Sequence, residues 1–143
     1  MKGKINLMDE LIERNKDESD VRMMPPLVWA YIGDSIYDLF IRMNLVNTTR
    51  LHPHELHVET IKFVKAKAQC KLLKRLEDLN FFSEEEEYVI KQGRNAQNHH
   101  IPKNVDIYEY MYATAFEALI GYLYLMKKND RLKEILKKCL EEN

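Results

Sequence analysis

Glycine, proline and cysteine are scarce in this chain of 143 residues, which holds four glycines, four prolines and two cysteines. So few turn-forming residues argue against a turn-dense β-sandwich, whereas abundant Leu, Lys, Glu, Ala and Tyr favour helices. Cys70 and Cys139 are far apart, and no secretory segment precedes them, so we expect reduced thiols and a cytoplasmic protein. No apolar run is long enough to span a membrane. We predict an all-α protein, folded as a compact helical bundle.

Several families of enzymes are excluded by missing motifs. The chain has no phosphate-binding Walker loop, no dinucleotide-binding glycine motif, and no Ser or Cys nucleophile beside an obvious base. His52, His54 and His57 lie close together but lack a cysteine or a fourth spaced ligand, so the sequence does not predict a zinc site there.

The expected organisation is an N-terminal arm, residues 1–24, followed by one domain over residues 25–143. The arm is expected to be partly flexible or to form one short helix. Within the domain, Ser83 with Glu86 and Asp106 with Glu109 are capping patterns that predict helix starts. The expected helices cover Pro25 to Met43, His52 through Arg75, Ser83 through Ile90, Ile107 to Met126, and Leu132 to Leu140.

Two apolar segments each carry a carboxylate where a packed helix normally has a hydrocarbon side chain. Asp34 lies within the run 29–41, and Glu117 lies within the run 113–123. Burying an unpaired carboxylate is costly, so each acid needs a partner. Small residues flank both acids, and two carboxylates with space around them can share a hard divalent cation. The sequence therefore predicts a metal site for phosphate chemistry.

A structural role for these acids stays open at this point. Either acid can cap a helix, face solvent, or form an ion pair with Arg42 or Arg94. Asp38 lies one helical turn after Asp34, but Arg42 follows one turn later still. For Asp38 we therefore predict an ion pair with Arg42.

Charge is unevenly distributed although the formal net charge is only −1. The segment from Ile61 to Arg75 has six basic residues and no acid, and acids follow soon after. Gly93-Arg94-Asn95 begins a polar, basic loop. A solvated helix face and a helix C-cap are the simpler interpretations of these features. Together, however, they can bind backbone phosphates of a nucleic acid.

Three motifs together resemble the ribonuclease III catalytic domain. They are Ile32-Gly33-Asp34-Ser35-Ile36-Tyr37-Asp38, Gly93-Arg94-Asn95-Ala96, and the segment Thr114 to Leu123, in matching order and spacing. Lys65-Ala66-Lys67-Ala68-Gln69 lies between them, as in the small subfamily called Mini-ribonuclease III. The resemblance extends from about Leu27 to the C-terminal helix. Residues 25–143 are thus expected to be a ribonuclease III-like catalytic domain.

The resemblance implies a homodimeric endoribonuclease that cuts double-stranded RNA with Mg²⁺, for which Mn²⁺ substitutes, and leaves 5′-phosphate ends. Asp34 and Glu117 match the catalytic and metal-binding acids of the family. In this subfamily the implied substrate is precursor 23S ribosomal RNA, with a ribosomal protein or pre-ribosomal particle as a further partner. Lys65, Lys67, Gln69, Arg94 and Asn95 are the expected RNA-binding residues, and the exposed apolar residues of the segment 29–40 are the expected dimer interface.

Two departures from the family distinguish this chain. Full-length ribonuclease III enzymes carry Glu where this chain has Ala30, and Asp where it has Thr114. The loss of two carboxylates keeps an alternative open, namely a non-catalytic helical RNA-binding or scaffold protein. A protein-interaction bundle without a nucleic-acid role is a second alternative. Retention of both Asp34 and Glu117 favours the nuclease.

Overall fold

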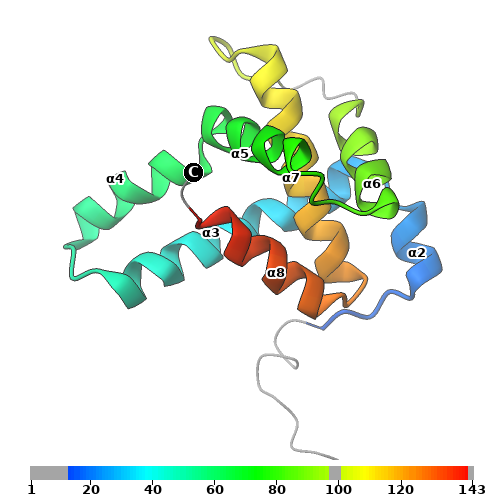
Figure 1. Ribbon diagram of the computed structural model, residues 1–143, viewed down its shortest axis with the longest axis horizontal. Coiled ribbons are helices and arrows are strands. Elements are labelled where there is room, and N and C mark those ends of the chain that lie inside the picture. Colours follow the sequence, from blue (N-terminus) through cyan, green and yellow to red (C-terminus); the bar gives the residue numbers. More distant parts are fainter. Residues whose placement is uncertain (1–12, 97–100, 142–143) are drawn as a thin grey trace, which may run out of the picture.

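A computed structural model describes residues 13–96 and 101–141, and these are folded as helices joined by short loops, without a strand (Figure 1). The predicted all-α class is confirmed. Seven helices occupy the described residues: α2 (Glu18–Met23), α3 (Pro26–Thr48), α4 (Pro53–Val64), α5 (Ala66–Asp78), α6 (Glu84–Arg94), α7 (Ile107–Leu125) and α8 (Asn129–Cys139).

Helix α7 forms the centre of the bundle, and α3, α5, α6 and α8 pack around it (Figure 1). Every residue of α7 from Ala113 to Leu123 is buried except Glu117, which is half-buried. A helix that is apolar on all sides needs neighbours on all sides, which accounts for this central position. Glu117 is thus the one acid in the most enclosed stretch of the described chain.

Helices α3 and α7 approach each other at backbone contact. A Cβ atom on Gly33 would lie 1.7 Å from the backbone oxygen of Glu117, and one on Gly121 would lie 1.8 Å from that of Trp29. Neither position has space for a side chain. Two of the small residues near the acids, Gly33 and Gly121, therefore serve close helix packing. Because Asp34 follows Gly33, this packing places Asp34 beside Glu117.

The predicted helix starts are confirmed at two positions. The Ser83 hydroxyl accepts a hydrogen bond from the Glu86 backbone N–H, and the Glu86 carboxylate accepts one from the Ser83 N–H. The Asp106 carboxylate likewise accepts from the Glu109 N–H at the start of α7. Each side chain satisfies a backbone donor that has no partner within the helix.

The single helix expected from His52 through Arg75 is wrong. Lys65 has extended backbone angles (φ −65°, ψ 152°) and separates α4 from α5. The Val64 carbonyl oxygen then accepts a hydrogen bond from the buried amide of Gln69. Because that bond is made by a side chain of the next helix, no glycine or proline is needed at the break. Helix α3 also continues beyond Met43, to Thr48.

Part of the N-terminal arm packs on the domain. Residues 1–12 lie outside the described part of the chain, and α2 follows at Glu18–Met23. Val21 of α2 is fully buried, and its carbonyl oxygen accepts a hydrogen bond from the Trp29 indole N–H at 2.9 Å. Among its described residues, the arm thus supplies Val21 to the hydrophobic core. Within the described ranges, no helix combines the length and apolar character needed to cross a membrane.

Candidate active site

The two predicted acids meet where α3 crosses α7. Asp34 is exposed on α3, and Glu117 is half-buried on α7, one residue after Phe116 in the core. Burial, followed by a hydrogen bond to Asp34 and the negative charge of Asp34, raises the pKa of Glu117 to about 8. Two carboxyl groups in contact cannot both ionise without a cost. The site therefore favours a positive charge between them.

Arginine does not supply that charge. Arg42 Nε lies 2.8 Å from the Asp38 carboxylate, so the predicted Asp38–Arg42 ion pair is confirmed. Arg94 instead lies over the ring of Tyr112, 5.6 Å from its centroid. In the described part of the chain, neither Asp34 nor Glu117 forms an ion pair with Lys or Arg. Of the structural alternatives for the two acids, pairing with Arg42 or Arg94 is thus not what the structure shows, whereas exposure to solvent holds for Asp34.

Gln69 is the third polar side chain at this crossing. It belongs to α5, is 1% exposed, and its Nε2 donates to the Glu117 carboxylate at 3.4 Å and to the Val64 carbonyl oxygen at 3.0 Å. This placement contradicts the expected contact of Gln69 with RNA, because so deeply buried an amide does not reach a duplex on the surface. The resemblance of the segment Lys65 to Gln69 to the subfamily indicated that Gln69 belongs to the site. It did not indicate that the Gln69 side chain points into the bundle.

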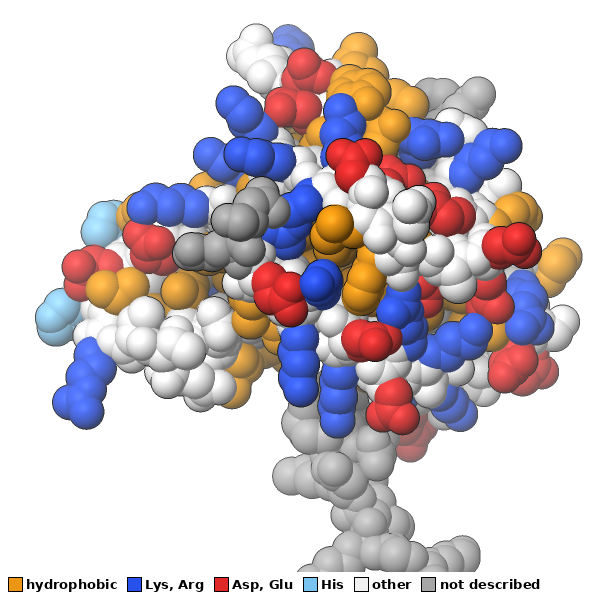
Figure 2. All heavy atoms as spheres, in the orientation of Figure 1, with side chains coloured by type: hydrophobic (Ala, Val, Ile, Leu, Met, Phe, Trp, Pro, Cys, Tyr) orange, Lys and Arg blue, Asp and Glu red, His pale blue; other side chains and the backbone are white. Residues whose placement is uncertain are grey.

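The other expected RNA-binding residues lie at the ends of helices that pack on α7. Lys65 and Lys67 are exposed at the start of α5, and Asn95 is exposed at the C-terminal end of α6. Arg94, beside Asn95, is half-buried. Lys and Arg side chains gather over α5 in Figure 2. The molecule thus has basic side chains on two helices that flank α7.

Gly93 sets the position of Arg94 and Asn95. A Cβ atom on Gly93 would lie 2.8 Å from Cβ of Ala118 and 2.9 Å from Cα of Ala115. Glycine therefore lets the end of α6 lie against α7 on either side of Glu117 in sequence. The first residue of the motif Gly93-Arg94-Asn95-Ala96 thus meets a packing requirement.

The two positions that lack a family carboxylate are both buried. Ala30 lies one turn before Asp34, and the Thr114 hydroxyl donates to the Tyr110 carbonyl oxygen of its own helix at 3.0 Å. The described residues contain no cluster of three or more His, Cys, Asp or Glu side chains that could enclose a metal ion. Among the described residues, this crossing thus brings together two carboxylates, those of Asp34 and Glu117, without the two further acids of the full-length enzymes.

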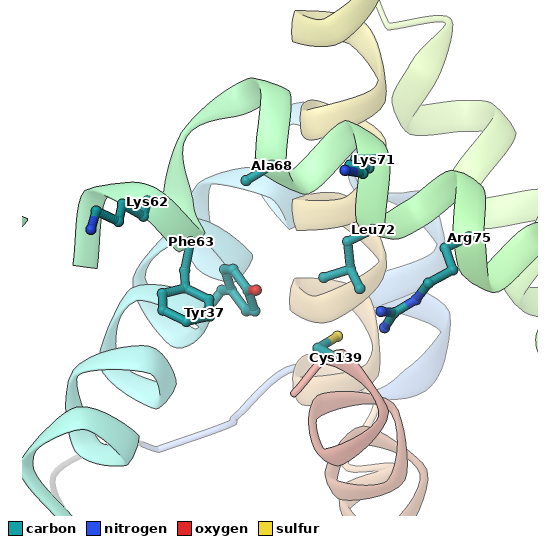
Figure 3. A pocket seen from close by; sticks show the side chains of 8 residues that line it. All are labelled: Tyr37, Lys62, Phe63, Ala68, Lys71, Leu72, Arg75 and Cys139. Carbon is teal, nitrogen blue, oxygen red and sulfur yellow. The ribbon is translucent and has the colours of Figure 1, made fainter. Parts of the chain in front are cut away.

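A separate cavity of about 190 Å³ lies between α3, α4, α5 and α8 (Figure 3). The Tyr37 hydroxyl points into it, and Leu72 and Cys139 close the opposite side (Figure 3). Burial raises the pKa of the Cys139 thiol to about 12, so this cysteine is a poor nucleophile. The cavity is part of the packing of α8 and contains neither Asp34 nor Glu117.

Comparison with known proteins agrees with the geometry of this crossing. The ribonuclease III domain family matches residues 27–128, a range that includes both acids. A Mini-ribonuclease 3 of Thermoanaerobacter sp. is 48% identical over 116 residues, which are 81% of this chain and 80% of that protein. The chain belongs to the Mini-ribonuclease III subfamily of the ribonuclease III family. The predicted family is confirmed.

Other members and one solved structure support the same assignment. The Mini-ribonuclease 3 of Staphylococcus aureus is 36% identical over 126 residues, covering 88% of this chain and 94% of that protein. A crystal structure of a Fusobacterium nucleatum protein superposes with a TM-score of 0.72 at 31% identity, covering 82% of this chain and 93% of that one. This Mini-ribonuclease III chain is accordingly an endoribonuclease for double-stranded RNA, as the resemblance implied.

Proposed function

We propose that Asp34 and Glu117 hold Mg²⁺ at the α3–α7 crossing and that this site cleaves double-stranded RNA of the 23S ribosomal RNA precursor. One observation carries the proposal: two carboxyl groups from different helices are in hydrogen-bond contact, and burial and the Asp34 charge raise the pKa of Glu117 to about 8. A divalent cation between the two groups would offset the repulsion that the fold imposes.

The donor set fits Mg²⁺. This ion prefers oxygen ligands, keeps several waters, and is usually held by one or two carboxylates together with substrate phosphates. Asp34 and Glu117 provide two carboxylates, and Ala30 and Thr114 add none. When bound, Mg²⁺ or Mn²⁺ would supply an acidified water and neutralise charge on the scissile phosphate.

The side chains of the site have different roles in this proposal. Asp34 is exposed, so a phosphate of the substrate can reach it, whereas Glu117 is enclosed and held by its helix. Lys65 and Lys67 would contact backbone phosphates, and Arg94 and Asn95 would contact phosphates or 2′-hydroxyl groups. An A-form duplex is recognised mainly through its backbone and shape, which suits basic helix ends better than base-specific pockets.

Cutting both strands requires two sites, and we propose a homodimer with a twofold axis. An apolar groove of about 560 Å³ lies between α3 and α8 and offers a surface for this contact. Tyr31 and Leu39 of α3 are 77% and 52% exposed, so both side chains are accessible to a second copy of the chain. Trp29, in contrast, is buried and belongs to the core. The apolar lining residues of the groove are Ile32, Ile36, Leu39, Leu132 and Leu136.

The precursor of 23S ribosomal RNA is proposed as substrate because the subfamily resemblance implies it. A ribosomal protein or a pre-ribosomal particle is the matching partner, since a folded RNA stem is presented in that context. The basic side chains at Lys65, Lys67 and Arg94 are compatible with such a stem. They are also compatible with other duplexes, so the choice of RNA needs an experiment.

The decisive experiment compares Asp34→Asn and Glu117→Gln with Asp38→Asn. Asp38 lies on the same helix one turn after Asp34 and is paired with Arg42, so its variant controls for loss of an acid near the site. Purified proteins are incubated with an end-labelled 23S precursor stem, an unrelated duplex and a single strand, with Mg²⁺ or with chelator.

We expect wild type and Asp38→Asn to cut the duplexes only with Mg²⁺ and to leave 5′-phosphate ends. Asp34→Asn and Glu117→Gln should bind RNA but cut about 10²- to 10³-fold more slowly, the order of loss seen when a group that stabilises transition-state charge is removed. Full activity of either variant would refute the proposed site. Binding without cleavage by wild type would favour the non-catalytic RNA-binding alternative.

A further inference from the structure

Gln69 differs from the other buried polar side chains of the described residues. Thr60 and Thr114 donate to carbonyl oxygens of their own helices, at 2.8 Å and 3.0 Å, and Glu86 is paired with Arg131. Gln69 instead reaches from α5 to a different helix, and its Oε1 is a buried oxygen that has no hydrogen-bond partner within the described residues. Such atoms are rare in folded proteins and commonly mark functional sites.

The orientation of the Gln69 amide is determined by its surroundings. A carbonyl oxygen only accepts hydrogen bonds, so the Val64 oxygen at 3.0 Å requires the amide nitrogen, and not Oε1, on its side. The same nitrogen faces the Glu117 carboxylate at 3.4 Å. One NH₂ group therefore connects the break between α4 and α5 to the enclosed acid of the site.

Local structure explains why this connection exists. Lys65 leaves the helical conformation, so the Val64 carbonyl oxygen, in the last turn of α4, is available to a side chain. Gln69 begins the second turn of α5, and its own N–H donates to the Lys65 carbonyl oxygen at 3.1 Å. The break that exposes Lys65 is thus stabilised by the side chain that contacts Glu117.

We propose that Gln69 is a positioning residue of the metal site: its amide N–H group holds the Glu117 carboxylate in place and ties it to the α4–α5 break. The proposal rests on the proposed function, in which Asp34 and Glu117 hold a divalent cation. Partners that orient a metal ligand typically contribute 10- to 100-fold in metal affinity. In this role Gln69 acts through Glu117 and does not contact the reacting atoms.

The test uses Gln69→Met in the full chain, because methionine has a similar length and no donor. Thr60→Val is the matched control: it removes a buried hydrogen bond that stays within α4. Mn²⁺ binding to the metal-free protein is measured by electron paramagnetic resonance in the absence of RNA. The cleavage rate is then measured as a function of Mg²⁺ concentration.

We expect Gln69→Met to weaken Mn²⁺ binding 10- to 100-fold and to raise the Mg²⁺ concentration for half-maximal rate by a similar factor. The rate at saturating Mg²⁺ should stay within about threefold of wild type, because the acids themselves are intact. In a Glu117→Gln background, Gln69→Met should cause no further loss of Mn²⁺ affinity. Thr60→Val should match wild type in both measurements.

An Mn²⁺ affinity within twofold of wild type would overturn the role of Gln69, and so would a lower maximal rate at an unchanged Mg²⁺ requirement. If Gln69→Met fails to fold, Gln69→Asn is used. It keeps the amide but is one methylene shorter, so it should also lose metal affinity. Asp34→Asn separates the two proposals: full Mn²⁺ affinity in that variant would refute the metal site itself, whatever Gln69→Met shows.

Discussion

Glu117→Gln should make the metal-free protein more stable at neutral pH, although we expect the same change to remove activity. In the folded chain, burial and the contact with Asp34 raise the pKa of Glu117 to about 8, against 4.5 for an unperturbed glutamate. The folded state therefore binds a proton more tightly than the unfolded state does. Stability is unaffected below pH 4.5, falls as the pH rises from 4.5 to about 8, and is constant above that range.

The magnitude follows from the same pKa. Each pH unit within this range costs about 1.4 kcal/mol of unfolding free energy. The cost is below about 1 kcal/mol at pH 5, about 3 kcal/mol at pH 7, and at most about 5 kcal/mol above pH 9. These values are upper limits because the half-buried side chain keeps some contact with water. A glutamine at this position carries no charge at any pH, so its variant avoids the cost.

The assay is urea unfolding in chelator at pH 5, 7 and 9, with Ser35→Ala as a control on the same helix. Trp29 is the only tryptophan of the chain, and it is buried beside the crossing, so its fluorescence reports on this region. The difference in unfolding free energy between Glu117→Gln and wild type should grow from pH 5 to pH 9. Mg²⁺ should reduce this difference by stabilising wild type alone. If the difference in unfolding free energy between the two proteins changes by less than about 1 kcal/mol across this range, the assigned environment of Glu117 is refuted.

Three further changes test other parts of the site. Gly33→Ala places a Cβ atom 1.7 Å from the Glu117 backbone oxygen, so it should destabilise the protein by about 3 kcal/mol in urea unfolding; a neutral effect would show that α3 and α7 do not contact there. Replacing Lys65 and Lys67 by alanine should reduce the salt dependence of RNA binding by about one counterion each, whereas Lys137→Ala on α8 should leave it unchanged; equal slopes would remove the two lysines from the RNA surface. Leu39→Glu should convert a dimer to monomers in analytical ultracentrifugation and slow double-strand cutting, and an unchanged sedimentation profile would move the interface elsewhere.

Local rules predicted the parts of this fold that depend on neighbouring residues. The caps at Ser83 and Asp106 require only a side chain and a backbone N–H three residues later, and both are present. The Asp38–Arg42 pair likewise depends only on helical spacing. The break at Lys65 could not be predicted in this way, since it is stabilised by an amide that lies inside the bundle.

In the site, too, some features follow from the local sequence and others depend on how the helices pack. The apolar surroundings of Asp34 and Glu117 indicated that the acids need a partner, and the family motifs indicated that they belong together. The direction of Gln69 depends on how α5 packs against α7, and helical spacing alone does not determine that packing. Likewise, the sequence suggested that Gly33 and Gly121 leave space for a ligand. In the structure, the backbone of the opposite helix occupies the space beside each glycine.

The backbone contact at Gly33 and Gly121 also bears on how this enzyme can lose activity. The two acids stand on helices whose backbones touch without intervening side chains, so the backbone that carries one acid cannot move away from the other while the core stays closed. Local opening of the site would require opening of the most buried part of α7. Amide hydrogens of residues 29–33 and 117–121 should then exchange only through global unfolding, and heat should abolish cleavage and folding at the same temperature.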